Sequence, residues 1–369
     1  AAAEALARSG DKATQNRMKE WLKSEASAEV KLRLAVALVG STRDKDLIPD
    51  VIRLMVEVGN EQAWRAEDLL WRLAGEDGPM VALGNDPASR DKTRDEWLKW
   101  WEANKGKIDM ARLDEESSYG LTIVCEMPFR GGLGRVVALG GDGKVRWEVK
   151  GLNWPMDAVP LAGRRILIAE HNANRIIERE IDGNKIIWME PINQPVNVGR
   201  LPNGVTWAVG RNQIIEWERG DKSGKKQIFT FVRNEYDIVA GARLKSGDYV
   251  LLTQNQQLLK VDRKGTIVKA HGVGGNGINY YSTVDVLPNG KVLCTLMTSI
   301  TEFDLETGKA GQSFNFQMAT SAVRLRNGNT LVGNQNNGRI IELDKDGKPT
   351  KWQYTSSDAS YRAFRAFRR

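Results

Sequence analysis

Residues 156–367 repeat one pattern of short apolar runs, and its period of about 40 residues constrains the fold more than any other feature. The first run of each unit ends in a turn that begins with Leu161, Leu201, Leu244, Leu287 or Leu325, at spacings of 40, 43, 43 and 38 residues. The third run keeps the same period, at Arg175–Glu178, Gln213–Glu216, Gln257–Lys260, Ser299–Glu302 and Arg339–Glu342. Two independent landmarks that share one period indicate a tandem structural repeat.

Each unit contains four short runs joined by tight turns, as expected of a four-stranded antiparallel sheet. A glycine follows the third run of every unit, and glycine tolerates the positive φ that tight hairpin turns need. These glycines are Gly143, Gly183, Gly224, Gly265, Gly308 and Gly347. Four-stranded units of this length that repeat around an axis are the blades of a β-propeller.

The two ends of the repeat predict how the ring closes. Leu121–Met127, Gly134–Leu139 and Lys144–Val149 supply only three strands of the earliest blade, without an innermost one. Ala359–Phe367 remains after the last complete blade. We predict that this C-terminal segment pairs into the earliest blade and completes six blades, because closure removes exposed strand edges that invite aggregation.

Residues 1–116 have a different pattern, in which apolar side chains recur at helical spacing. Gly40, Gly59 and Gly75 stand where we expect helix C-caps, which favour glycine. Short helices with such connections predict a small stack of helical repeats. The predicted helical segments are Val30–Leu38, Leu47–Met55, Ala66–Leu73 and Ser89–Asn104. The sequence therefore predicts a multidomain chain with an α-helical domain over residues 1–116 and an all-β, six-bladed propeller over residues 117–369 that the C-terminal strand closes.

The charge distribution and the lengths of the apolar runs limit the classes of partner that the chain can bind. Residues 1–116 carry 19 Lys and Arg against 23 Asp and Glu, a net charge of −4, whereas the remaining 35 basic and 24 acidic residues give the propeller +11. A basic propeller favours anionic partners, although a basic surface also serves solubility alone. Tyr361–Arg369 interleaves Arg with aromatic residues, but its role as a strand accounts for them, so nucleic acid is not expected as a partner. No apolar run approaches the roughly 20 residues that span a bilayer, so no membrane span is expected.

Other motifs point away from metal and cofactor chemistry. Cys125 and Cys294 stand in apolar runs of different blades, where we expect buried thiols. No His and Cys cluster has zinc spacing, and Asp344–Gly347 matches the hairpin turn of the other blades rather than a calcium loop. We therefore expect neither a metal nor a cofactor. The chain begins without Met, as expected of a processed or excised piece whose parent chain carries further domains.

Some segments resemble known families. The Leu-Pro-Asn-Gly turns, MDAVPLAGRRILIAEHNANRIIE at 156–178 and the DGNKIIW ending resemble bacterial propellers of the quinoprotein-like and arylsulfotransferase-like families, over residues 121–367. VKLRLAVALVGSTRDKDLIPDVIRLM at 30–55 resembles HEAT repeats, and AEDLLWRLAGE with RDEWLKWWEANKGKIDMARL is similar to segments of large, often secreted, bacterial multidomain proteins. The resemblance implies HEAT-like repeats over residues 1–116 and a secreted or periplasmic location. Such motifs are specific for fold and say little about activity, since propellers host many functions.

The chain departs from both propeller families. The arylsulfotransferase-like enzymes rely on His residues in the central cavity, whereas this chain has only His171 and His271, of which the second is expected at the surface. Quinoprotein dehydrogenases tend to have eight blades and a calcium-bound cofactor, whereas six blades are predicted here.

One face of the predicted propeller gathers polar side chains, because in an antiparallel blade the start of the first strand and the end of the second lie at the same face. The first set stands four residues before each turn Leu and comprises Asp157, Asn197, Ala240, Thr283 and Ser321, with Asp237 as a substitute in the fourth blade if its strand is longer. The second set follows the second strands and comprises Glu170, His171, Asn172, Arg211, Asn212, Gln254, Asn255, Thr298, Asn334, Gln335 and Asn336. Connections between blades add Trp154, Tyr236, Tyr280 and Tyr281. Amides with aromatic platforms suit a neutral polar ligand such as a sugar. In the alternative interpretation, the amides only satisfy loop backbone.

Two functions of different classes remain. The first is a non-enzymatic binding module, whose propeller face binds a carbohydrate, peptide or protein partner and whose helical repeats serve as a protein-docking domain. The second is a cavity enzyme, an arylsulfotransferase-like transferase or a lyase, that uses His171 with Asp157 and Glu170. We favour the first because acid–base catalysis needs titratable groups with tuned pKa values near the substrate, and few stand at this face.

Overall fold

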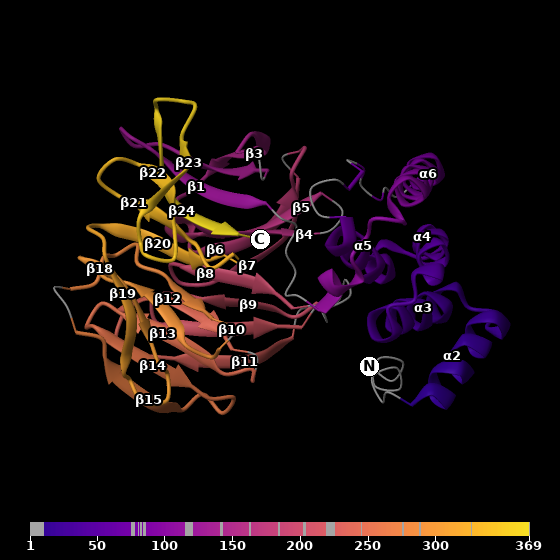
Figure 1. Cartoon of the computed structure of the whole chain (residues 1–369), viewed down its shortest axis with the longest axis horizontal. Helices are drawn as coiled ribbons and strands as arrows, with labels where there is room; N and C mark the ends of the chain where they lie inside the picture. The colour runs from indigo at the N-terminus through magenta and orange to yellow at the C-terminus, as the bar shows by residue number, and fades with distance from the viewer. Residues whose placement is uncertain are drawn as a thin grey trace. The chain divides into compact units, whose positions relative to one another are not determined.

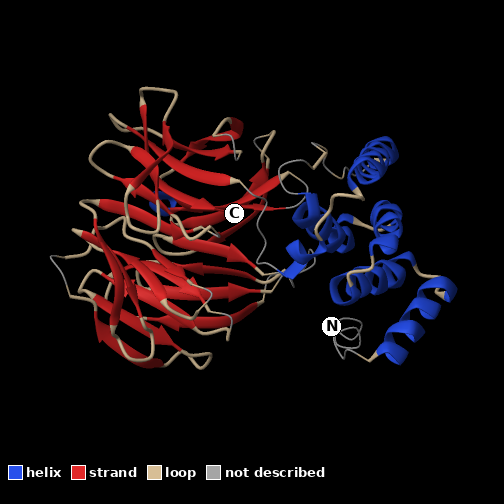
Figure 2. Cartoon of the chain, viewed as in Figure 1, coloured by secondary structure: helices blue, strands red, loops and turns tan. Residues whose placement is uncertain are grey.

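The computed structural model describes residues 11–74, 78–79, 81, 83, 86–114, 121–140, 143–161, 164–183, 185–201, 204–218, 226–244, 246–274, 277–287, 289–325 and 327–368. The chain divides into two compact units, one that contains the α-helices and one that contains nearly all of the strands. Figure 2 shows the α-helices in one unit and the strands in the other, with the short 3₁₀ turn η4 (His171–Ala173) among the strands. Within the described ranges, no helix combines the length and the apolar character that crossing a bilayer requires.

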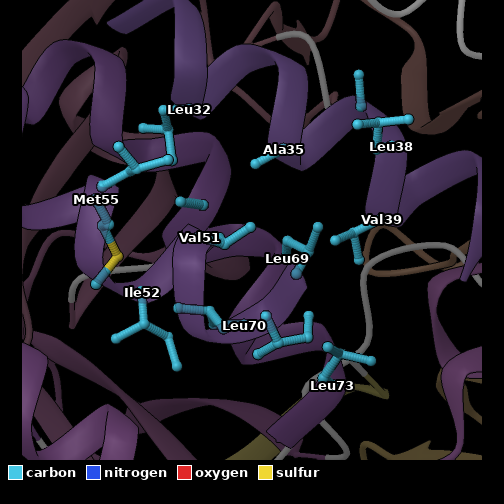
Figure 3. Packing of buried hydrophobic residues seen from close by; sticks show 14 of the residues in the cluster. Leu32, Ala35, Leu38, Val39, Val51, Ile52, Met55, Leu69, Leu70 and Leu73 are labelled. Atoms are coloured by element: carbon cyan, nitrogen blue, oxygen red, sulfur yellow. The ribbon is translucent and has the colours of Figure 1, made fainter. Parts of the chain in front are cut away.

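The α-helices of the first unit pack around one apolar core. Leu38, Ile52 and Leu70, from three successive helices, are completely buried there, and Figure 3 shows the surrounding side chains from the same helices pointing toward one another. Burial of such side chains supplies the main stabilisation of short helices. The helices are α2 (Lys12–Ser24), α3 (Ala28–Thr42), α4 (Ile48–Glu57), α5 (Asn60–Ala74) and α6 (Pro87–Asn104), with short 3₁₀ turns η1 (Lys45–Leu47) and η3 (Met110–Asp114).

The helix ends differ in part from the prediction. Gly40 lies inside α3 rather than after it. The helix ends at Thr42, because Arg43 takes the left-handed conformation, with φ 59°, at the C-cap. Gly59 does follow α4, one residue after its C-cap Val58, whereas Gly75 lies outside the described residues. Helix α2 was not predicted, because its only buried side chains are Met18 and Leu22 and its apolar pattern is correspondingly weak.

The second unit is a six-bladed β-propeller, as predicted. Six four-stranded antiparallel sheets account for the strands of the described residues. Blade 1 contains β24 (Tyr361–Arg368), β1 (Thr122–Pro128), β2 (Gly134–Leu139) and β3 (Val145–Leu152), and blade 2 contains β4 (Pro155–Leu161), β5 (Arg165–Glu170), β6 (Arg175–Glu180) and β7 (Ile186–Pro191). Blade 3 contains β8 (Asn197–Arg200), β9 (Thr206–Val209), β10 (Gln213–Trp217) and β11 (Gln227–Val232), and blade 4 contains β12 (Ile238–Arg243), β13 (Tyr249–Thr253), β14 (Gln257–Val261) and β15 (Ile267–Gly272). Blade 5 contains β16 (Val284–Val286), β17 (Val292–Thr295), β18 (Ser299–Phe303) and β19 (Ala310–Asn315), and blade 6 contains β20 (Ala319–Arg324), β21 (Thr330–Asn334), β22 (Arg339–Leu343) and β23 (Pro349–Thr355).

The C-terminal strand closes the ring, which confirms the prediction for Ala359–Phe367. Strand β24 pairs antiparallel with β1, with Phe367 opposite Ile123, and supplies the innermost strand of blade 1. In Figure 1 the yellow β24 accordingly lies beside the magenta β1, although the two are separated by most of the chain. Four of the turn glycines also behave as expected, since Gly143, Gly265, Gly308 and Gly347 have φ between 71° and 80°, whereas Gly183 does not have a positive φ and Gly224 lies outside the described residues.

Charged side chains join neighbouring blades. A buried glutamate on the third strand of one blade accepts from a partly buried arginine on the innermost strand of the next. A buried carboxylate needs such partners, because an unpaired buried charge costs several kcal/mol, on the order of 3–5. The pairs and their N–O distances are Glu178–Arg200 at 2.6 Å, Glu216–Arg243 at 2.8 Å and Glu302–Arg324 at 2.9 Å.

Candidate functional site on one face of the propeller

The loops between the second and third strands and the connections between blades lie on the same face of the ring, since all the sheets are antiparallel. We call this face the polar face. It includes the ends of β5, β9, β13, β17 and β21 and the starts of the innermost strands. The two sets of residues that the sequence places on this face have different environments in the structure.

The first set lies on the innermost strands and faces the neighbouring blades rather than solvent. We call it the inner-strand column. Asp157, Asn197, Thr283 and Ser321 are at most 5% exposed. Each of these side chains accepts a hydrogen bond from a backbone N–H of the next blade, at N–O distances of 3.2, 3.0, 3.0 and 3.1 Å respectively. These donors are Val198, Gly241, Ala322 and Ala366. The column therefore connects blades.

Two positions of the column depart from this pattern. Ala240 of blade 4 has no polar group to offer, although it is buried like the others. The sixth position, in β24, is Arg365, because the backbone N–H of its successor Ala366 donates to Ser321 just as that of Gly241 donates to Asn197. Arg365 is completely buried and was missed in the sequence, since no turn leucine follows it to mark the column. Burial lowers the pKa of its guanidinium to about 10. This value is still well above 7, so the side chain is charged at neutral pH.

The second set is more exposed. Asn172, Gln254, Asn255 and Asn336 all lie on loops of the polar face with exposed side chains. The amides of Asn172 and Asn336 make no side-chain hydrogen bond within the described part of the chain. By contrast, other members of the set form hydrogen bonds that stabilise the loops. Asn334 binds the backbone of its own turn, Gln335 accepts from Asn279 at 2.7 Å and Asn212 accepts from Asn193 at 3.2 Å. Thr298 accepts Phe316 N–H through its backbone carbonyl at 3.0 Å.

Arg211 and Asp237 organise the connection between blades 3 and 4. Arg211 donates to the carbonyls of Ile238 and Tyr236, at 3.1 and 2.7 Å, and to the amide oxygen of Gln254 at 2.9 Å. The carboxylate of Asp237 pairs with Arg233 at 2.9 Å and also accepts from Asn255 at 3.1 Å. The Tyr236 ring is also accessible, at 59% exposed.

The connection between blades 4 and 5 caps the propeller axis. Tyr281 lies nearly parallel to Trp154 of blade 2, with ring centroids 6.4 Å apart, and packs edge-on against Phe364 of blade 1. The neighbouring Tyr280 lies under the guanidinium of Arg211 from blade 3, at 4.7 Å from the ring centroid. One connection therefore contacts three other blades. Both Tyr280 and Tyr281 remain partly exposed.

His171 is buried beneath this cap and pairs with Tyr280. The ring nitrogen Nδ1 lies 3.2 Å from the carbonyl of Pro195, and Nε2 lies 2.6 Å from the Tyr280 hydroxyl. A carbonyl only accepts, so Nδ1 carries the proton and the Tyr280 hydroxyl donates to Nε2. Burial, together with the positive charges of Arg365 and Arg211, lowers the pKa of His171 to about 4, so the imidazole is neutral at pH 7.

The carboxylates that we associated with His171 have other contacts. Asp157 accepts from the Asn197 amide at 3.1 Å as part of the column. Glu170 accepts from Arg175 Nε at 2.7 Å and from the backbone N–H of Asn153 at 2.7 Å. The side chain that does contact His171 is Tyr280. Sequence spacing did not predict this pair, because Tyr280 lies in a different blade connection. His271 lies on β15, half-buried, with Nε2 3.2 Å from the Leu305 carbonyl.

Comparisons with known proteins support the fold alone. No family model and no curated protein matches the sequence. A crystal structure of a protein of unknown function from Bacteroides caccae superposes with a TM-score of 0.51 at 14% identity, over 67% of this chain and 99% of that one. The virginiamycin B lyase of Staphylococcus aureus superposes with a TM-score of 0.40 at 15% identity, over 56% of this chain and 71% of that one. The resemblances to quinoprotein-like and arylsulfotransferase-like propellers and to HEAT repeats stay predictions.

Proposed function

We propose that the propeller is a non-enzymatic binding module whose polar face binds an uncharged polar ligand, with a carbohydrate as the best chemical match. The observation that carries this proposal is the pair of free, exposed amides at Asn172 and Asn336. Each amide offers both donors and an acceptor. Trp154 and Tyr281 add two nearly parallel rings on the same face, and aromatic faces bind the apolar side of a sugar ring.

The buried inner-strand column is a poorer candidate for ligand binding than the exposed loop amides. Asp157, Asn197, Thr283 and Ser321 already hold the next blade, so a ligand would have to compete with buried backbone hydrogen bonds to use them. The exposed loop amides have no such competition. We therefore place the ligand on the second set and on the aromatic cap.

The helical unit fits a protein-docking role in this proposal. Trp21 of α2 and Val30 of α3 are 40% and 39% exposed, and such apolar side chains on short stacked helices provide contacts for a partner. A secreted or periplasmic location, which the resemblance implies, would bring the propeller to extracellular glycans.

A glycan array probed with the intact chain tests the proposal, followed by calorimetric titration of the best hit. Asn172→Ala with Asn336→Ala should weaken binding about 30-fold, because two hydrogen bonds of about 1 kcal/mol each are lost. Asn289→Ala is the matched control, since this exposed asparagine lies in a turn between first and second strands, at the opposite face. Absence of any glycan hit, or an unchanged affinity in the double variant, would refute the proposed site. Binding of a peptide instead would replace the ligand class.

The 2.6 Å contact between His171 and Tyr280 favours a second candidate, an enzyme that moves a proton at the cap. A neutral imidazole that already accepts from a phenol is placed to take the phenolic proton when Tyr280 acts on a substrate. The enzyme that the sequence predicted would use His171 with Asp157 and Glu170, and Tyr280 is the partner that the geometry supports. Turnover of a bound hit that disappears in Tyr280→Phe would support this candidate, whereas tight binding without turnover in either protein would support the module.

A further inference from the structure

The propeller axis is occupied by one buried guanidinium. Within the described part of the chain, Arg365 donates five hydrogen bonds, and every acceptor is a backbone carbonyl of another blade or blade connection. The acceptors and their distances are Tyr281 at 3.0 Å, Met156 at 3.2 Å, Val196 at 2.9 Å, Val239 at 3.3 Å and Ser282 at 2.9 Å. All five N–H donors of the guanidinium are thus used.

Four of these carbonyls belong to one structurally equivalent position. Met156, Val196, Val239 and Ser282 each immediately precede a member of the inner-strand column, in blades 2, 3, 4 and 5. In blade 4 the pairing register shifts between Ile238 and Ala240, so that Val239 is the extra residue of a β-bulge. A bulge leaves the extra residue outside the ladder, which frees its carbonyl for another partner. The repeat therefore builds a ring of carbonyl oxygens around the axis.

This ring attracts a cation. Carbonyl oxygens that converge in a buried space need donors, because a buried carbonyl without a partner costs about 1–3 kcal/mol. The buried Asp157 carboxylate adds a negative charge that stabilises the Arg365 cation. The acceptors are contributed by the blades, and the cation is contributed separately by the closing strand β24.

We propose that the axis of the propeller is a guanidinium-binding site, separate from the ligand site of the polar face, which the chain fills with its own Arg365. Removal of this side chain would leave the carbonyl ring in place. A small free guanidinium ion then fits the vacated position and restores the hydrogen bonds that hold the blades together.

The geometry selects a planar cation over a metal ion. The central carbon of a guanidinium lies about 1.3 Å from its nitrogens, and these nitrogens lie 2.9–3.3 Å from the carbonyl oxygens. The oxygens therefore lie roughly 4 Å from the centre of the ion, whereas Ca²⁺ needs oxygens at about 2.3–2.6 Å. An ammonium ion with three N–H donors cannot satisfy all five carbonyl acceptors.

Chemical rescue of Arg365→Ala in the full chain tests the proposal. Methylguanidinium chloride at 10 mM should raise the Tm of the variant by about 3–5 °C, if it binds with a Kd of about 1 mM. The same concentration of sodium, methylammonium or calcium chloride should not. The wild-type chain reports any general effect of the salt, and Arg365→Lys provides a matched variant whose side chain still fills the axis and should not respond.

The outcomes are decisive. A Tm rise confined to methylguanidinium and to Arg365→Ala supports the site. Equal responses to methylguanidinium and methylammonium, or a response of Arg365→Lys as large as that of Arg365→Ala, would overturn it. If Arg365→Ala does not fold alone, it is refolded from urea with each salt, and the far-UV circular dichroism of the β-sheets is measured. Recovery with methylguanidinium only supports the site, and recovery with none of the salts overturns it.

Discussion

Replacement of Asn197 by Ala tests whether the inner-strand column stabilises the ring or serves a ligand. The Asn197 amide is 5% exposed, donates to the carboxylate of Asp157 at 3.1 Å and accepts from the backbone N–H of Gly241 at 3.0 Å. One side chain therefore joins blades 2, 3 and 4. Ala at this position removes both bonds and leaves the Gly241 N–H without its acceptor in a buried environment.

The expected loss follows from these two contacts. An unsatisfied buried donor costs about 1–3 kcal/mol, and the loss of one donor to a carboxylate costs about as much. Asp157 keeps its bonds from the backbone N–H groups of Ala158 and Val198, at 2.8 and 3.2 Å, which limits the second contribution. We therefore expect Asn197→Ala to lower the free energy of unfolding by about 2–4 kcal/mol.

Urea unfolding followed by circular dichroism of the β-sheets measures this loss. Asn172→Ala is the matched control, because it removes the same side chain from an exposed loop of the same face and should change stability by at most about 0.5 kcal/mol. Asn197→Asp adds a second test, since it places two carboxylates together. It should be destabilised at pH 7 and partly recover near pH 4, where the pair can share a proton. Equal stability of Asn197→Ala and Asn172→Ala would refute the structural role of the column.

Three further results are expected. Deletion of residues 359–369 removes β24 and should lower the Tm sharply, and an unchanged Tm would contradict closure by this strand. Burial alone would raise the pKa of Glu216, but hydrogen bonds from Arg263, Arg243 and Tyr249 hold this pKa below its usual value. The wild-type chain should therefore lose stability as the pH falls through that lowered pKa. Urea titrations of Glu216→Gln should lack this part of the acid sensitivity. His171 has a lowered pKa of about 4, so the unfolded chain binds its proton first and acid favours unfolding between pH 6.5 and 4, by roughly 3 kcal/mol. His171→Gln should flatten the stability profile over that range, and a profile identical to wild type would show that His171 does not titrate as described.

The repeat explains why the fold and the position of the column could be predicted from the sequence, whereas the hydrogen bonds of the column could not. Turn leucines and hairpin glycines are local signals, and they located the blades and the closing segment correctly. The same spacing located the column at Asp157 and Asn197. Its partners, however, are backbone groups of the next blade about 40 residues away. A polar residue near a face has the same sequence signal whether it meets solvent or a neighbouring strand.

Arg365 and Tyr280 show a stronger limit of sequence spacing. Arg365 reaches the axis because β24 pairs with β1, so its place in the column follows from a pairing between the two ends of the propeller. Tyr280 meets His171 because a connection between blades 4 and 5 crosses to blade 2, a distance of 109 positions in the sequence. Helix α2 was missed for a local reason, since Met18 and Leu22 alone mark its buried face.

In the proposed binding module, the groups that stabilise the ring would be separate from those that bind the ligand. Arg365 fills the axis with hydrogen bonds to backbone carbonyls, one of which belongs to Tyr281 of the cap, so the proposed ligand would meet the cap before any buried group. His171 is 1% exposed, and its Nε2 is already engaged by Tyr280. Catalysis at His171 therefore requires Tyr280 to act on the substrate or to move, whereas binding at the exposed amides requires neither. This difference is why the amides of the outer loops, rather than the buried histidine, carry the proposed function.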